Sequence, residues 1–141
     1  MLNEENLYGY IIKFDNGCHI QVDLLHGQLL KSPVTTASYP QVISVRSTKM
    51  KLLCYLLENA FETIVSREEI LEKVWEASNL SSSYQRLVQV ATKLKEELLY
   101  LDAPVNFITY YRGKGYTINC SKILRLHSNA IYNNEKTTNL L

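Results

Sequence analysis

The sequence contains few of the features that mark secreted, membrane-spanning or disulfide-bonded proteins. Its three cysteines, Cys18, Cys54 and Cys120, lie far apart and form no C-x-x-C pair, so we expect free thiols rather than disulfides or metal ligands. No uncharged apolar run is long enough to cross a bilayer. The acidic N-terminal stretch MLNEENLYGY lacks the basic start and apolar segment of a secretory signal, which favours a cytoplasmic location.

Motifs for catalysis and cofactor binding are equally scarce. The histidines His19, His26 and His127 are far apart, and apart from the adjacent Cys18 none has a carboxylate or thiol at ligand spacing, so we predict no metal site. The segment RGKG at 112–115 lacks both the G-x-x-x-x-G-K-[ST] pattern and a following helix. No segment resembles a catalytic nucleophile paired with a general base. We therefore expect neither an enzyme nor a bound cofactor.

Neither sign of charge is in large excess over the whole chain, whose formal net charge is +1. The two parts of the chain differ, however. Residues 1–80 carry 7 Lys and Arg against 10 Asp and Glu, whereas residues 81–141 carry 8 against 4. We therefore expect a surface for an anionic ligand in the C-terminal part.

The composition is that of a folded globular domain. With 141 residues, 46% of them hydrophobic and 21% charged, the chain can bury a core without disulfides or a structural metal. Alternating apolar residues in YIIKF and CHIQVDLL, joined by the turn residues DNG, predict a β-hairpin. QLLK and VISV add two strands, so residues about 8–45 are expected to form a small antiparallel sheet.

Three helices are predicted after the sheet, at about 48–59, 66–76 and 82–100, because the apolar residues change to a helical repeat. Pro104 follows the third helix and prevents its continuation. The residues expected on the buried faces are Met50, Leu52, Leu53, Leu56, Leu57, Ile70, Leu71, Val74, Trp75, Leu87, Ala91, Leu94 and Leu98.

Serine and threonine side chains are placed to cap these helices. Ser47 or Thr48 is expected to cap the first helix, and Ser82 the third. Ser66 and Glu69 have the spacing of a capping box at the start of the second.

The chain returns to β structure after Pro104. VNFITYY and YTINC flank the turn RGKG, so residues about 106–120 are predicted to form a hairpin with Arg112 and Lys114 at its tip. Alternation is expected to place either Tyr110 or Tyr111 against the core, together with Tyr116. Residues 122–141 begin with a short apolar patch and become polar, which predicts a frayed C-terminal tail after a domain of residues 1–121.

Three segments, VSREEILEKVW at 65–75, LVQVATKLKEEL at 87–98 and YYRGKGYTI at 110–118, resemble the OmpR/PhoB-type winged helix-turn-helix DNA-binding domain. In that family they form the supporting helix, the recognition helix and the wing. The resemblance implies an α+β fold, a winged helix-turn-helix with an N-terminal antiparallel sheet, three helices and a C-terminal β-hairpin wing. It also implies a bacterial transcription regulator that binds specific double-stranded DNA.

The chain has no room for the receiver domain of a response regulator, and it therefore most resembles the ToxR/CadC-like one-component regulators. In these proteins a cytoplasmic winged helix comes first, often followed by a linker and a single inner-membrane span. By this resemblance, residues 122–141 would begin the linker, and the protein would meet a membrane only through a span beyond Leu141.

The residue types on the third helix and the hairpin suit contacts with DNA. Glutamine pairs with adenine, arginine with guanine, and lysine contacts phosphates. A basic residue on a narrow turn reaches into the minor groove, with Arg112 as the first choice and Lys114 as the second. The candidate DNA-binding residues are Ser83, Gln85, Arg86, Gln89, Thr92, Lys93, Lys95, Tyr111, Arg112 and Lys114.

Glu96 and Glu97 occupy positions that are usually basic in the family, and we expect them to weaken phosphate contact. Together with the low net charge, they keep an alternative open, in which the winged helix binds a protein such as RNA polymerase or another regulator.

One small domain buries modest area on DNA, so a homodimer on repeated half-sites is expected for useful specificity.

Overall fold

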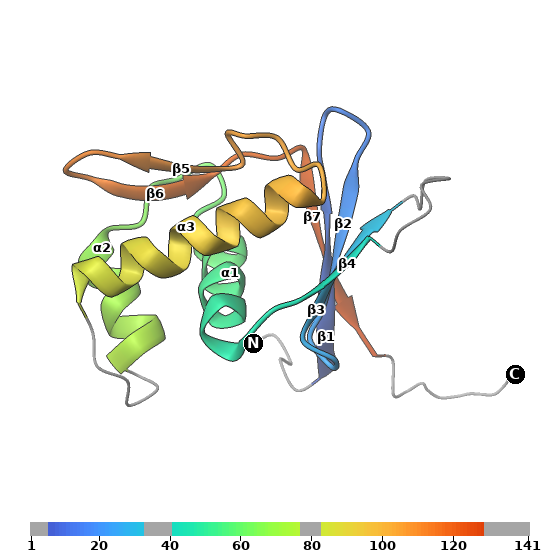
Figure 1. The fold of residues 1–141 in the computed structure, drawn as a ribbon, viewed down its shortest axis with the longest axis horizontal. Helices are drawn as coiled ribbons and strands as arrows, with labels where there is room; N and C mark the ends of the chain where they lie inside the picture. The colour runs from blue at the N-terminus through green and yellow to red at the C-terminus, as the bar shows by residue number, and fades with distance from the viewer. Residues whose placement is uncertain (1–5, 33–40, 77–82, 129–141) are drawn as a thin grey trace, which may run out of the picture.

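An antiparallel sheet forms one end of the molecule (Figure 1). The computed structural model describes residues 6–32, 41–76 and 83–128. The sheet has the strand order β4-β3-β2-β1-β7. Its strands are β1 (Leu7–Lys13), β2 (His19–Asp23), β3 (Gln28–Ser32), β4 (Val42–Ser44) and β7 (Lys122–His127). The first four are the four strands that the sequence predicted between residues about 8 and 45.

The helices and a second, smaller sheet form the other end of the molecule (Figure 1). Helix α1 spans Ser47–Asn59, and α2 (Arg67–Ile70) continues into a π-helical turn, η2 (Leu71–Trp75). Helix α3 spans Tyr84–Tyr100. Strands β5 (Ile108–Tyr111) and β6 (Gly115–Ile118) pair as a hairpin, called the wing below. This arrangement is the predicted α+β winged helix.

One hydrophobic core joins the sheet to the helices. Every residue that the sequence placed on a buried helix face is buried, and so is Val90, which the prediction did not include. The sheet contributes the side chains of Tyr10, Ile12, Ile20 and Leu29. Alternation in the strands and the helical repeat thus converge on the same interior.

Serine side chains cap α2 and α3, but only the cap of α2 is the residue that the sequence predicted. Ser66 Oγ accepts the N–H of Glu69 at 3.1 Å, as its capping-box spacing predicted. At the start of α3 the cap is Ser83, whose Oγ accepts the N–H of Arg86 at 3.0 Å. Ser83 is the extended residue directly before the helix, which is the geometry that capping requires, whereas the predicted Ser82 lies outside the described residues.

Strand β7 corrects the prediction of a frayed tail from residue 122. Lys122–His127 pairs antiparallel along β1, which would otherwise be an edge strand with unpaired backbone groups. Ile123 packs against the core, and Arg125 donates to Glu58 of α1 at 2.6 Å. Residues 129–141 lie outside the described part of the chain.

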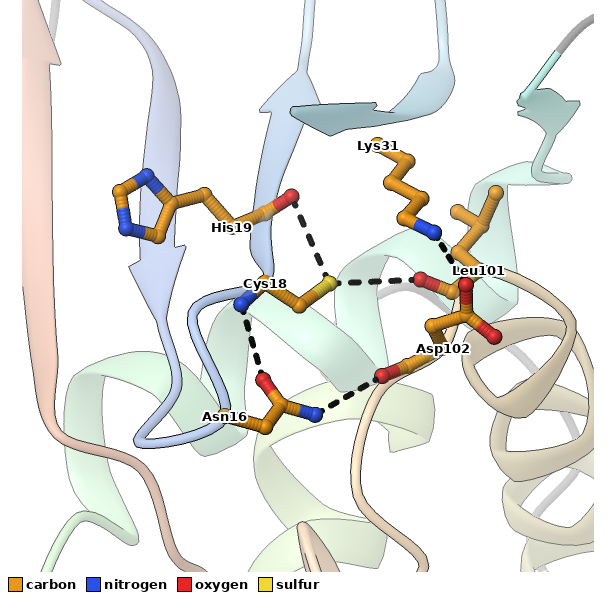
Figure 2. Close-up of polar contacts among 6 residues, drawn as sticks. All are labelled: Asn16, Cys18, His19, Lys31, Leu101 and Asp102. Atoms are coloured by element: carbon orange, nitrogen blue, oxygen red, sulfur yellow. Dashed lines mark hydrogen bonds and ion pairs between the residues drawn. The ribbon is translucent and has the colours of Figure 1, made fainter. Parts of the chain in front are cut away.

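A polar junction ties the sheet to the end of α3 (Figure 2). The Cys18 thiol donates to the carbonyl oxygen of Leu101 at 3.5 Å, and Asn16 Nδ2 donates to that of Asp102 at 3.4 Å. The ammonium of Lys31 pairs with the Asp102 carboxylate. These contacts hold the end of α3 against the β1–β2 turn and β3.

Candidate nucleic-acid interface

The polar side of α3 is exposed from its first turn to its middle. Leu87, Ala91, Leu94 and Leu98 face the core, which leaves the opposite side to solvent. The exposed candidates on this helix and at its cap are Ser83, Gln85, Arg86, Gln89, Thr92 and Lys93. Lys95, on the flank, is half-buried.

A groove of about 650 Å³ separates this side of α3 from the start of α1. Four of the predicted residues line it, namely Arg86, Gln89, Thr92 and Lys93. Its other wall includes Arg46, Thr48 and Lys49. The sequence did not point to these three, because only the packing of α1 against α3 brings them to the same surface.

The start of α1 adds positive potential to the groove. We predicted a Ser47 or Thr48 cap, but Ser47 is already helical and Arg46 occupies the N-cap position without a side-chain hydrogen bond. The first turn contains no acidic residue. A helix N-terminus presents free N–H groups and a partial positive charge, which favour an anion nearby.

The two glutamates that were expected to repel phosphate behave differently. Glu97 Oε2 pairs with the Nζ of Lys49 at 2.7 Å, and both side chains are largely buried between α1 and α3. The charge of Glu97 is therefore compensated inside the fold. Glu96 is exposed and lines the groove, so the expected weakening of phosphate contact stays a prediction for Glu96 alone.

The wing lies on the opposite flank of α3 from α1. Val105 and Ile108 share a small cavity with Lys95 and Leu99 of α3. Figure 1 shows the hairpin extending in the same direction as α3, with its turn toward the end at which the helix begins. The polar side of α3 is therefore bordered by the start of α1 on one flank and by the wing on the other.

A tight turn exposes the two basic residues of the wing. The N–H of Lys114 donates to the carbonyl oxygen of Tyr111 at 2.9 Å. Between them Gly113 has a φ of 76°, a conformation that glycine adopts without strain. Arg112 and Lys114 are both exposed at this turn, as the sequence predicted.

The paired tyrosines of the wing differ from the prediction, because neither is buried. Tyr110 is 37% exposed and Tyr111 is 48% exposed. Tyr110 does lie on the inner side of the hairpin, where its ring centroid is 4.9 Å from that of its cross-strand neighbour Tyr116. With only two strands in the wing, this ring covers the buried Tyr116 and stays partly exposed itself.

The described ranges hold neither a metal-binding cluster nor a membrane-spanning helix. No three His, Cys, Asp or Glu side chains there are placed to hold a metal ion. No helix there is both long and apolar enough to cross a membrane.

Comparison with known proteins identifies the fold and the family. No curated protein matches this sequence. The DNA-binding domain of E. coli CadC superposes with a TM-score of 0.66 and 15% identity, over 86% of this chain and 99% of that one, a likeness that shows the fold. Residues 40–118, more than half of the chain, match the family described as "Transcriptional regulatory protein, C terminal". Members of this family are DNA-binding domains and not enzymes. The family match and the likeness to the CadC domain confirm the resemblance seen in the sequence. The chain belongs to this family, the OmpR/PhoB type of winged helix, and is the DNA-binding domain of a transcription regulator.

Proposed function

We propose that the domain binds specific sequences of double-stranded DNA, with the polar side of α3 in the major groove and the wing in the adjacent minor groove. The observation that carries this proposal is the position of that side of α3 between two cationic borders. One border is the start of α1 with Arg46, and the other is the turn of the wing with Arg112 and Lys114. A helix that reads base edges needs phosphate contacts on both sides to hold its register.

The residues divide into base-reading and phosphate-binding groups. Gln85 and Gln89 suit adenine and Arg86 suits guanine, because their side chains can pair bidentately with those bases in the major groove. Contacts with DNA phosphates are assigned to Ser83, Thr92, Lys93, Lys95 and Tyr111. Arg112, with Lys114, is assigned to the minor groove, whose negative potential attracts basic side chains.

Two further proposals follow from the size of the domain and from its ligand. A single small domain buries modest area on DNA, so two copies on repeated half-sites would provide useful specificity. DNA as the ligand places the domain in the cytoplasm, and attachment to a membrane through a span beyond Leu141 stays a prediction. The second candidate function, binding of RNA polymerase or another regulator, is favoured by the exposed Glu96 beside the base-reading residues.

A salt titration of binding to a mixed-sequence duplex separates these two functions. If about four basic side chains contact phosphates, the slope of log affinity against log salt concentration is roughly −3 to −4 per protomer. The affinity is measured by fluorescence anisotropy between low and physiological salt. A slope near zero would contradict DNA binding and support the protein-partner function.

Two substitutions test the assignment of residues within the interface. Arg112→Ala should weaken binding to most sequences, whereas Gln89→Ala should change the preference among sequences by about 1–3 kcal/mol for each lost base contact. Selection from a random duplex library reports the preference. Lys122→Ala, which removes an exposed positive charge from β7, is the control and should bind like the parent. Parent-like binding by both test variants would refute the assignments.

A further inference from the structure

Arg67, the first residue of α2, lies between the start of α3 and the wing. Its guanidinium carbon is 4.3 Å from the centroid of the Tyr84 ring, which belongs to the first residue of α3. It is 5.7 Å from the centroid of the Tyr110 ring in β5. Both distances are within the range of cation–π attraction. One side chain therefore contacts both elements that the proposed function assigns to the DNA grooves.

Neighbouring contacts hold both rings in place. The Tyr84 hydroxyl donates to Glu68 Oε2 at 2.7 Å, and this hydrogen bond raises the pKa of Tyr84. Tyr110 packs on the ring of Tyr116. The rings that receive Arg67 are thus anchored to α2 on one side and to β6 on the other.

The backbone before α2 supports the same junction. Val65 and Tyr116 exchange two hydrogen bonds, of 2.8 and 2.9 Å, which attach β6 to the residue before the Ser66 cap. These bonds determine where the base of the wing lies. They leave the outer strand β5 without a backbone bond to α2 or α3 among those that the structure describes. At this end of the wing, the Arg67 side chain connects α2 to β5 through the ring of Tyr110.

We propose that Arg67 is a positioning residue that sets the separation between α3 and the wing, so that both enter neighbouring grooves together. The inference rests on the proposed function, since the separation matters only if both elements bind the same duplex. Arginine suits this role because its planar, delocalised cation lies on two aromatic faces at once. The half-buried position of Arg67 between the rings distinguishes it from the exposed Arg112, which is assigned to DNA itself.

The first test needs no DNA. Ring currents of Tyr84 and Tyr110 should shift the Arg67 side-chain Nε–H signal in a proton–nitrogen NMR spectrum of the parent domain. Tyr84→Leu or Tyr110→Leu should move the signal toward its position in a denatured chain. Tyr84→Phe keeps the ring and should leave the signal close to that of the parent. An Nε–H signal already at the denatured position in the parent would overturn the proposal.

The second test measures affinity for a mixed-sequence duplex at low salt. Arg67→Met keeps the length of the side chain without its charge, and we expect it to weaken binding about tenfold. Tyr84→Leu should produce a similar loss, because it removes the surface on which the cation rests. The double variant should bind within about twofold of either single variant, since both changes remove the same contact. Tyr84→Phe should bind like the parent.

Each remaining result counts for or against Arg67 as a positioning residue. Unchanged binding by Arg67→Met would overturn the proposal. A loss in Arg67→Met that Tyr84→Leu does not reproduce would also overturn it, and would indicate a direct contact between Arg67 and phosphate. Additive losses would overturn it as well. If Arg67→Met does not fold, as judged by its thermal transition, Tyr84→Leu and Tyr84→Phe carry the comparison. Failure of the parent to bind DNA would contradict the proposed function instead, and the NMR result would still report on the junction.

Discussion

Gly115 occupies the position where the wing makes its closest approach to the residues before α2. A Cβ atom at this residue would lie 2.0 Å from the carbonyl oxygen of Val65, and the backbone has a φ of 147°. Gly113, two residues earlier, also has a positive φ, but a Cβ there would meet nothing within 4 Å. The two glycines of the turn are therefore required for different physical reasons.

Gly115→Ala should destabilise the domain more than Gly113→Ala. The second change introduces only backbone strain, about 1–2 kcal/mol, whereas the first adds a clash with backbone that must separate β6 from Val65. We expect a loss of at least about 3 kcal/mol for Gly115→Ala, measured by urea unfolding. Equal losses for the two variants would show that the wing can move away from α2 at little cost.

Among the larger elements, β7 is attached to α1 through a shared carboxylate. Glu58 Oε1 accepts from Arg125 Nη1 at 2.6 Å, and Glu58 Oε2 accepts from the Tyr10 hydroxyl at 2.6 Å. Burial, reinforced by the hydrogen bond to Glu58, raises the pKa of Tyr10 above its usual value. Two other nitrogens of Arg125, Nε and Nη2, are buried without a hydrogen-bond partner among the described residues. Glu58 thus satisfies groups on both β1 and β7.

Removing the acceptor should therefore cost more stability than removing the cation. Glu58→Ala leaves both Tyr10 and a partly buried charge on Arg125 without their partner, and we expect a loss of about 2–4 kcal/mol. Arg125→Met also removes the two unpartnered nitrogens, and should cost less than about 1.5 kcal/mol. Urea unfolding of both variants provides the comparison. A larger loss for Arg125→Met would contradict this account of how β7 is held.

The same elements explain how much of the fold could be predicted from the sequence. The helices were predictable because apolar residues that recur at the helical repeat face the core, as Leu87 and Leu98 do in α3. Strand β7 was not, since Leu124 pairs with Ile11, more than a hundred positions earlier, and no local pattern contains that partner. The turn at Gly113 and the exposure of Arg112 were local properties and could be predicted.

The cationic borders of α3 show which part of the candidate site could not be predicted from the sequence. The polar side of α3 follows from helical periodicity, but its relation to Arg46 and Lys49 depends on the packing of α1. The pairing of Lys49 with Glu97 likewise joins residues on separate helices. Arg67 was also missed, because its role depends on two rings that come from different elements. Tertiary packing, rather than residue type, decides which surface charges belong to the site.

At the scale of the whole molecule, the three thiols and the buried phenol of Tyr116 favour the protonated state. Burial raises the pKa of Cys18, that of Cys54 to about 12 and that of Cys120 to about 11. It also raises the pKa of Tyr116. These groups come from the β1–β2 turn, α1, the wing and the connection to β7, so their titration reports on several parts of the fold.

The free energy of unfolding should consequently decrease as the pH rises above about 8.5, where cysteines of the unfolded chain begin to ionise. A group whose pKa is higher in the folded state stabilises the fold below its unfolded pKa, and this contribution disappears as the pH rises through the folded value. Urea unfolding between neutral pH and pH about 10.5 measures the trend, with a slope of up to roughly 1.4 kcal/mol per pH unit for each proton involved. Cys54→Ala removes one such group and should reduce the slope relative to the parent. Stability that stays constant across this range would show that the thiols ionise as readily in the folded domain as in the unfolded chain.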